Sequence, residues 1–520
     1  MSRLALMLVL AALPAAAQSP ATPLGPAYTE PLRPQIHFSP REHWMNDPNG
    51  LVYFEGEYHL FFQFNPQGDT PGHISWGHAV SKDLLHWQEL PVAIPAIAGD
   101  QNELVFTGSV VVDDENSSRL CANNKPCLVA IYTAHHDKSG TETENREAQA
   151  LAVSQDRGRT WQRFAGNPVL DVGLPEFRDP SVSWSEENHA WLMAVSLPNE
   201  HQVAFFTSPN LKQWSRLSTF GPAGITNQHN PKAQWECPDL LHIPADSGKG
   251  PGTWALKVGM NPGSPQGGSG EQYFLGNFDG RTFTPSTLPG AHGWTDYGKD
   301  SYCAISYNNL PQTEQPTLIG WMDNWQYADK LPTIPWRGQM TLPRRVTWLT
   351  DSAGQSLKQD PVVAPLRIGK PTDISRTLKP DQALTLPSLT VPAELTLNIQ
   401  PNNAQTTGLR LYSDFDHYTE IAYNLTTHQL YTDRTHSLEA ATAPPDFLAR
   451  TEAPTAPTRP YDLHIILDRS SIEVFAQDGT IAMTTLVLPS TTKLRVELFT
   501  RGNTQPTQIT GKSWQLQPIW

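Results

Sequence analysis

Three acidic residues of this chain stand one or two positions ahead of a proline, beside aromatic or arginine neighbours. Asp47 lies in the run WMNDPNG at residues 44–50, Asp179 in FRDP at 177–180 and Glu236 in WECPD at 235–239. Proline fixes its own φ and an Asn-Gly pair tolerates positive φ, so we expect turns rather than helices to hold these side chains. Such a turn also fits a purely structural role, in which the acidic side chain only caps the end of a strand.

The three settings differ in a way that suits cleavage of a glycosidic bond. That reaction needs one carboxylate that stays ionised at the sugar cation, and one carboxylic acid that protonates the leaving oxygen. Glu236 is the better acid, because its tryptophan and cysteine neighbours give an apolar setting, which raises a carboxyl pKa. Asp47 suits the nucleophile. Asp179 follows Arg178, which favours its ionised form and a role in stabilising the transition state.

These acids are about 130 and 57 residues apart, so only the fold can bring them together. A weak repeat suggests how, because a polar turn followed by an aromatic that opens another strand recurs every 50 to 75 residues. Its copies are SKDLLHW at 81–87, SQDRGRTW at 154–161, SPNLKQW at 208–214 and, more loosely, NFDGRTF at 277–283. This interval fits a four-stranded propeller blade with loop insertions, and predicts a five-bladed β-propeller over residues 30–350. The alternative is that a turn before an aromatic is only a common hairpin ending.

The pattern changes after residue 361. Tryptophan nearly vanishes until the C-terminus, and short alternating segments appear at 394–399, 409–412, 463–467 and 494–499. Short strands without a helical period predict a C-terminal β-sandwich over residues 365–520. We place the boundary near residues 351–365. The predicted fold class is therefore all-β.

The chain has a net charge of −14 over 520 residues, and it contains 16 tryptophans. Nucleic acids and anionic membranes prefer basic surfaces, so neither is an expected partner. An acidic surface rich in tryptophan suits a neutral ligand such as a sugar.

The first residues have the pattern of a secretory signal peptide. Arg3 precedes an apolar run at 4–13 and small residues at 15–17, which predicts a signal peptide over residues 1–17. The run is too short to span a bilayer, and no later stretch reaches about 18 apolar residues. We therefore expect a soluble, secreted protein, in the periplasm or in the medium.

Four cysteines are few for a secreted chain of this length. Cys121 and Cys127 flank a short loop and are expected to form a disulfide. Cys237 and Cys303 lie in apolar or aromatic stretches, and we expect buried thiols. No Cys/His spacing suggests a zinc site, so no metal is predicted. We interpret His43 and the pair at 135–136 as polar loop residues.

Several motifs together show that the chain resembles glycoside hydrolase family 32, the β-fructosidases. Besides the three acidic runs, they include FFQFNP at 61–66, FTGS at 106–109, GWMDNW at 320–325 and SIEVFAQDG at 471–479. The run PWRGQMTLPR at 335–344 is most similar to the levanase and exo-inulinase branch. The resemblance covers nearly all of the chain after residue 17, in the order of the family, and implies a five-bladed propeller followed by a sandwich.

The resemblance also implies roles for single residues. Asp47 takes the place of the nucleophile, Asp179 that of the transition-state stabiliser and Glu236 that of the acid/base. The implied substrate contacts are Asn46, Gln63, Trp76, Phe106, Ser109, Arg178 and Trp321. Among the tryptophans, we expect Trp44, Trp76 and Trp321 to stack on sugar faces. No cofactor is implied.

The chain departs from the family pattern at Thr107, Ser181 and Ser301, where Ser, Lys and an aromatic are frequent. These departures leave the chemistry intact and affect the outer sugar subsites. The implied reaction is retaining hydrolysis of β-fructofuranosides, with fructan or sucrose as the substrate.

Three other functions fit parts of the pattern. A fructosyltransferase would pass the same covalent intermediate to a sugar, an arabinan- or xylan-directed propeller hydrolase would invert configuration, and a fructan-binding protein would lack catalysis. The sequence leaves levan, inulin and sucrose open as substrates, does not settle exo against endo action, and does not indicate an oligomeric state. The resemblance to the family favours exo action.

Overall fold

The structure is a computed structural model that describes residues 28–99, 102–137, 145–226, 232–288 and 291–520. The predicted signal peptide, residues 1–17, lies outside these ranges. Within them the chain forms strands, no α-helix, and four 3-10 helices: η1 (Ala122–Asn124), η2 (Pro198–Glu200), η3 (Ala328–Lys330) and η4 (Ala364–Leu366). The all-β prediction is therefore confirmed for this part of the chain. None of its helices is long and apolar enough to cross a membrane.

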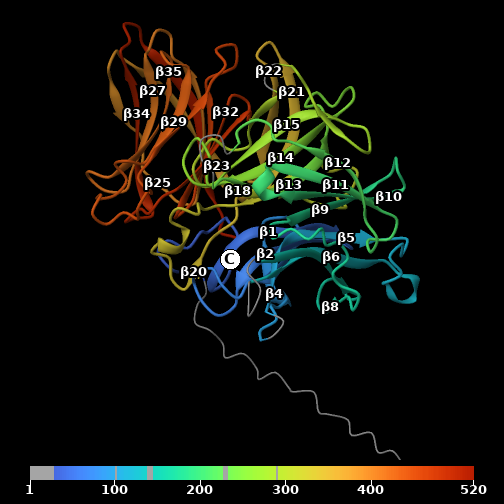
Figure 1. Cartoon of the computed structure of the whole chain (residues 1–520). Coiled ribbons are helices and arrows are strands. Elements are labelled where there is room, and N and C mark those ends of the chain that lie inside the picture. The colour runs from blue at the N-terminus through green and yellow to red at the C-terminus, as the bar shows by residue number, and fades with distance from the viewer. Residues whose placement is uncertain (1–27, 100–101, 138–144, 227–231, 289–290) are drawn as a thin grey trace, which may run out of the picture.

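Residues 43–361 form five sheets, which we call the five-sheet region (Figure 1). The first has the order β20 (Trp336–Arg337), β1 (His43–Phe54), β2 (Glu57–Asn65), β3 (Ser75–Ser81), β4 (Trp87–Ile94). The second is β5 (Glu103–Asp113), β6 (Cys127–His136), β7 (Arg146–Ser154), β8 (Gln162–Arg163), and the third β9 (Arg178–Ser185), β10 (Ala190–Leu197), β11 (Gln202–Ser208), β12 (Ser215–Phe220). The fourth is β13 (Gln234–Ile243), β14 (Thr253–Asn261), β15 (Gly270–Phe278), β16 (Phe283–Pro285), with β17 (His292–Trp294) on β15, and the fifth β18 (Tyr302–Ser306), β19 (Thr317–Trp321), β21 (Arg344–Asp351), β22 (Gly354–Pro361).

Five strands, one from each sheet, lie side by side around a common centre. β1 contacts β5, β5 contacts β9, β9 contacts β13, and β13 contacts β18, which returns to β1. The short strand β20 pairs in parallel with β1 at His43 and Trp44, so the chain after the fifth sheet closes onto the first. We call these five strands the inner strands. Residues far apart in sequence can therefore meet at this ring.

The four copies of the sequence repeat occupy equivalent places in four sheets. Each is the turn between the third and fourth strands in chain order: β3–β4, β7–β8, β11–β12 and β15–β16. An Asx side chain in each turn accepts backbone N–H groups of the following residues, which is why this polar pattern recurs. The acceptors are Asp83, Asp156, Asn210 and Asp279.

The middle strands of the first three sheets, such as β2, β6 and β10, are buried on both faces, because each sheet packs between two others. In β6, Val129 and Ile131 join a core with residues of β9, β10 and β11, whereas Leu128 and Tyr132 join the core on the other side, with Phe61 and its neighbours. Alternate residues of a strand point to opposite faces, so both sets are apolar. This double burial explains the long unbroken hydrophobic runs.

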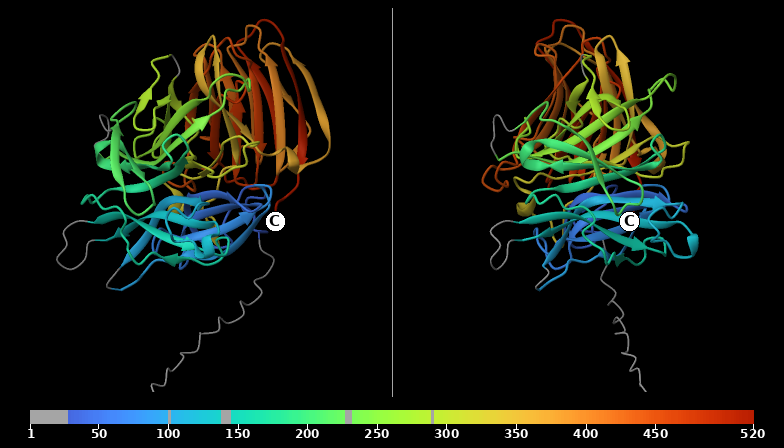
Figure 2. Two further views of the ribbon diagram at one scale, coloured as in Figure 1. Left: turned by 90° about the vertical axis from the view of Figure 1, so that its right-hand side faces the viewer. Right: turned by 45° about the vertical axis from the view of Figure 1, so that its right-hand side comes forward.

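Residues 367–516 form two further sheets, which we call the two-sheet region (Figure 2). One has the order β23 (Arg367–Leu378), β35 (Thr507–Leu516), β26 (Ala393–Gln400), β31 (Asp462–Leu467), β32 (Ser471–Ala476), β33 (Ile481–Leu486). The other is β24 (Ala383–Thr385), β34 (Lys493–Arg501), β27 (Thr406–Tyr412), β28 (Tyr418–Asn424), β29 (Gln429–Asp433), β30 (Arg450–Pro454), with β25 (Leu389–Thr390) on β34. Their facing apolar side chains, among them Leu395, Leu409 and Ile465, form one shared core.

The two regions meet through buried ion pairs as well as apolar contacts. Arg434 of the two-sheet region pairs with Asp300 at 2.6 Å and donates a hydrogen bond to the Tyr327 hydroxyl at 2.6 Å. Arg344 of β21 pairs with Glu473 of β32 at 3.4 Å, and Phe38 and Phe475 belong to one core that crosses the contact. Burying such charges is costly unless they are paired, so this contact is specific in geometry.

Candidate active site

Every inner strand is interrupted by a bulge at the same level of the ring. In each, two residues face a single residue on the neighbouring strand of its sheet, as the breaks in pairing register show. A bulge turns side chains out of the regular pleat and is common beside active sites. The two bulge residues of each strand, which are left out of the regular pairing, are Asn46 and Asp47 in β1, Phe106 and Thr107 in β5, Asp179 and Pro180 in β9, Cys237 and Pro238 in β13, and Cys303 and Ala304 in β18.

Asp47 lies buried at the first of these bulges, with 8 % of its surface exposed. Its Oδ2 accepts a hydrogen bond from the Thr107 hydroxyl at 3.0 Å and a long one from Gln63 at 3.5 Å, whereas its buried Oδ1 has no partner among the described residues. Burial, and then the negative charge of Glu236, raise the pKa of Asp47 to about 7. One carboxylate oxygen is thus fixed, and the other is free to react.

Glu236 is held by two polar partners from other inner strands. Its Oε1 accepts hydrogen bonds from Nε and Nη2 of Arg178 at 3.1 and 2.9 Å, and its Oε2 accepts one from the Tyr302 hydroxyl at 2.5 Å. The predicted apolar setting is wrong, because the neighbouring Trp235 points into the core between sheets. Adjacent residues of a strand point to opposite faces, so sequence neighbours do not form the surroundings of Glu236.

Asp179 adopts a left-handed backbone conformation, with φ of 65°. Its Oδ2 accepts a hydrogen bond from the Cys237 amide at 2.8 Å, and its own amide donates to the Thr133 hydroxyl at 3.0 Å. Burial raises its pKa well above the ordinary value, Arg178 lowers it, and Glu236 raises it further. The expected effect of Arg178 is present, but burial outweighs it.

The three acids therefore lie within electrostatic reach of one another. The charge of Glu236 raises the pKa values of both Asp47 and Asp179, and the charge of Asp47 also raises that of Asp179. Carboxylates that oppose one another's ionisation in a buried site are typical of acid/base chemistry. The structure brings together all three residues that the sequence singled out.

The remaining predicted contacts divide into groups beside the acids and groups behind them. Asn46 accepts a hydrogen bond from Trp44 at 2.8 Å, Gln63 reaches Thr107 and Asp47, and Phe106 stacks on His135 at 4.2 Å. The Ser109 hydroxyl accepts a hydrogen bond from the Val182 amide at 2.8 Å and donates one to the Pro180 carbonyl, so it joins β5 to β9.

The three tryptophans expected to stack on sugars are fully buried. Trp44, Trp76 and Trp321 have 0 % exposure, and Trp76 donates to the Phe106 carbonyl at 3.0 Å, so no ring face is open to a sugar. Trp325, 4.9 Å from Trp321 and 5.7 Å from Trp44, is only partly buried. It ends the GWMDNW run, so the sequence contained this signal.

Other residues of the site were missed because their sequence settings look ordinary. His135 lies on β6, not in a polar loop, and contacts Glu147 at 3.0 Å; His43 and His136 also lie on strands. Glu147 accepts the Phe177 amide and so supports the strand that carries Arg178.

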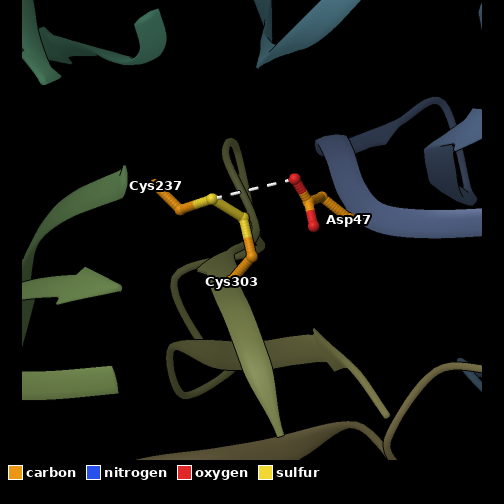
Figure 3. Close-up of side chains that lie close together, drawn as sticks. All are labelled: Asp47, Cys237 and Cys303. Carbon is orange, nitrogen blue, oxygen red and sulfur yellow. Dashed lines mark hydrogen bonds between the residues drawn. A yellow bond between two sulfur atoms is a disulfide. The ribbon is translucent and has the colours of Figure 1, made fainter. Parts of the chain in front are cut away.

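Both cysteine pairs are disulfides. The predicted Cys121–Cys127 bond is confirmed, whereas the prediction of free thiols at Cys237 and Cys303 is wrong, although both are buried as expected. Their bulges lie on neighbouring inner strands, which the sequence separation of 66 residues does not reveal. Figure 3 shows this bond beside Asp47. Asp47, Cys237 and Cys303 are the single cluster among the described residues whose spacing would suit a metal ion, but both sulfur atoms are bonded to each other in the disulfide.

Comparison with known proteins relates both regions to one family. Residues 37–361 match the glycosyl hydrolases family 32 N-terminal domain, and residues 365–515 match the family 32 C-terminal part. The chain is 38% identical to levanase of Bacillus subtilis (strain 168) over 91% of this chain and 68% of that protein. It is 39% identical to an extracellular exo-inulinase of Aspergillus awamori, over 92% and 93% of the two chains.

Solved structures agree. The exo-inulinase of Aspergillus awamori has a TM-score of 0.86 at 36% identity, covering 95% of this chain and 100% of its own. A fructofuranosidase of Schwanniomyces occidentalis, solved with fructose, has a TM-score of 0.82 at 29% identity, covering 95% and 100%. Together with the three acids that the inner strands bring to one site, these matches show that the chain belongs to glycosyl hydrolase family 32 and is a glycoside hydrolase.

Proposed function

We propose that this protein is a secreted, retaining β-fructosidase that releases fructose from levan, inulin or sucrose through a covalent fructosyl-enzyme intermediate. The observation that supports this most is geometric: Cys237, which follows Glu236, contacts both Asp47 and Asp179, so the three acids belong to one site, and the charge of Glu236 raises the pKa of Asp47. In a retaining site the two carboxyl groups lie about 5–5.5 Å apart, which leaves no room for a water between the sugar and the nucleophile, and this is the spacing that the proposal requires.

The proposed mechanism assigns a separate task to each acid. The unpartnered Oδ1 of Asp47 attacks the anomeric carbon of the fructosyl unit, while Glu236 gives its proton to the departing oxygen. Glu236 then takes a proton from a water molecule, whose oxygen bonds to the anomeric carbon as the bond from that carbon to Asp47 breaks, so fructose is released and the Asp47 carboxylate is restored. The anomeric carbon is a ketose centre, so its cationic transition state is relatively stabilised.

Asp179 and Arg178 hold the substrate and its developing charge. Asp179 is fixed by the Cys237 amide, so its remaining oxygen is available to the hydroxyls of the fructosyl ring. Asn46, Gln63 and Phe106 lie beside the acids as proposed sugar contacts. Ser109, Trp76 and Trp321 support the site from behind, and Trp325 replaces the buried tryptophans as the stacking aromatic.

The finer features of the fold belong to the same proposal. The five sheets, residues 43–361, are read as the five blades of the β-propeller expected over residues 30–350, and the two-sheet region as the β-sandwich expected over residues 365–520. Secretion is supported by the pattern at residues 1–17 and by the extracellular exo-inulinase named above.

Product analysis tests the proposal. Levan, inulin and sucrose are each digested, and NMR within the first minutes follows the anomer of the released sugar. Fructose in the β-furanose form as the first product supports a retaining exo-hydrolase, and a ladder of oligomers overturns the exo assignment. Longer fructans formed from sucrose would indicate a fructosyltransferase, the α anomer an inverting hydrolase, and no product a fructan-binding protein.

A further inference from the structure

The Cys237–Cys303 disulfide joins two inner strands that share no hydrogen-bonded ladder. Cys237 is in β13 of the fourth sheet and Cys303 in β18 of the fifth. Each is the first residue of its bulge, and both have left-handed φ values, 48° and 50°. Their exposed fractions are 1 % and 0 %, so the bond lies inside the protein, at the level of the acids.

The same two strands are also joined by the hydrogen bond from Tyr302 to Glu236, the proposed acid/base. The residue before Cys237 is Glu236, the residue before Cys303 is Tyr302, and these two side chains share the 2.5 Å hydrogen bond described above. The same two strands are therefore joined twice, once covalently and once through the reacting carboxyl group. Separation of the strands would move Glu236 away from its partner.

Cys237 also contacts the other two acids. Its sulfur lies 4.0 Å from Oδ2 of Asp47, as Figure 3 shows, and its amide donates to Asp179 at 2.8 Å. A disulfide sulfur has no proton to donate, whereas a thiol at this position would be a weak donor to Asp47. The oxidised pair thus covers Asp47 with apolar surface and adds no hydrogen bond that would stabilise its charge.

We propose that the Cys237–Cys303 disulfide is a positioning element of the active site, which holds Glu236 against Tyr302 and keeps Asp47 without a sulfur donor. The inference rests on the proposed function, because it assumes that Asp47 and Glu236 react with one sugar. A misplacement of about 1 Å in such a site costs about 100-fold in rate.

The second disulfide supplies a matched control. Cys121–Cys127 closes a short loop with a sequence separation of 6, at the core between the second and third sheets. It has no hydrogen bond or contact to the three acids among those described for its sulfurs, and its nearest polar neighbour is the Asp113 carbonyl at 3.6 Å. Both bonds can stabilise the fold, but only Cys237–Cys303 can position the acids.

The experiment compares two double variants on sucrose, Cys237→Ala/Cys303→Ala and Cys121→Ala/Cys127→Ala, by kcat, KM and the pH dependence of kcat/KM. We expect the first to lose about 10- to 100-fold in kcat with KM changed less than threefold, and to shift its pH profile. We expect the control to keep the wild-type kcat and profile, even where its melting temperature falls.

The single variant Cys303→Ala provides a second test in case the double variant Cys237→Ala/Cys303→Ala does not fold. It leaves the Cys237 thiol beside Asp47, and we expect the same loss of kcat together with an altered pH profile. Wild-type kcat and an unchanged profile in folded Cys237→Ala/Cys303→Ala or Cys303→Ala protein would overturn the inference. An inactive wild-type protein would instead refute the proposed function.

Discussion

The two regions of this chain use strands in opposite ways. In the five-sheet region each inner strand breaks its pairing register at one level; Asp47 and Asp179 lie in these breaks, and Glu236 lies directly before one. In the two-sheet region the central ladders, such as β27 with β28 and β31 with β32, run without a break. Regular ladders stabilise a fold, whereas bulges aim side chains at one point. The irregular strands are therefore the ones that carry the chemistry.

Buried carboxyl groups show the same contrast. Glu394 of β26 is fully buried, yet Arg367 at 2.6 Å and His464 at 2.7 Å hold its pKa below the ordinary value despite the effect of burial. Asp47 has only neutral hydrogen-bond donors, and its pKa rises to about 7. A fully paired carboxylate stabilises the structure, and a poorly paired one is available for reaction.

The largest expected effect separates these two carboxyl groups. Asp47→Asn removes the nucleophile and is expected to lower kcat by about 10⁴-fold or more. When several groups act as one catalytic unit, removal of a single member abolishes most of the rate enhancement of the whole unit. Glu394→Gln should leave kcat within twofold and lower the melting temperature. Steady-state kinetics on sucrose and thermal unfolding measure both. Full activity in Asp47→Asn would show that Asp47, like Glu394, has no catalytic role.

The contact between the two regions gives the next effect. Arg434→Met leaves Asp300 buried without its cation, which is expected to cost about 3–5 kcal/mol of unfolding free energy. Urea unfolding measures this loss, and kcat per folded molecule should stay unchanged, since Arg434 contacts none of the three acids in the described contacts. A loss of kcat without a loss of stability would show that the two-sheet region takes part in catalysis.

The raised pKa of Asp47 predicts a pH-dependent cost in stability. A carboxyl group whose pKa is raised on folding binds its proton more tightly in the folded state, so stability falls as pH rises from 3.8 to about 7. At about 1.4 kcal/mol per pH unit, the cost is at most about 4 kcal/mol. Asp47→Asn should therefore be more stable than wild type at pH 8 and equal to it below pH 4, as measured by urea unfolding. Equal stability of the two proteins at pH 8 would contradict the raised pKa.

The smallest effect concerns exposed aromatics. Trp325→Ala removes the partly buried ring beside the site, and loss of about 0.5–1.5 kcal/mol of aromatic contact should raise KM for sucrose about 2- to 12-fold with little change in kcat. Phe415→Ala removes a ring that is 88 % exposed on the two-sheet region and should leave KM unchanged. Equal KM values in the two variants would exclude Trp325 from sugar binding.

The sequence predicted the residues whose signal is local. Each acid stands before a proline turn, and the Asx turns of the repeat recur in four sheets, so the acids and the third-to-fourth-strand turns could be located from short runs. The two-sheet region was also recognisable, because its strands alternate apolar and polar residues.

The sequence did not predict the contacts that depend on how the sheets pack against one another. The partners of Glu236 come from β9 and β18, the bond between Cys237 and Cys303 joins separate sheets, and Trp76 is covered by neighbouring strands. Such contacts depend on which strands lie side by side around the ring. A single sequence does not state that arrangement.

Trapping of the covalent intermediate tests directly whether Asp47 is the nucleophile. In Glu236→Gln, a fructosyl fluoride can react without a proton donor, but the variant lacks the base that activates water, so the ester should accumulate. We expect mass spectrometry of the digested protein to find one fructosyl unit on the peptide that contains Asp47, and none when Asp47→Asn is added. A fructosyl unit on another residue, or turnover of the fluoride that persists in the Asp47→Asn/Glu236→Gln protein, would contradict it.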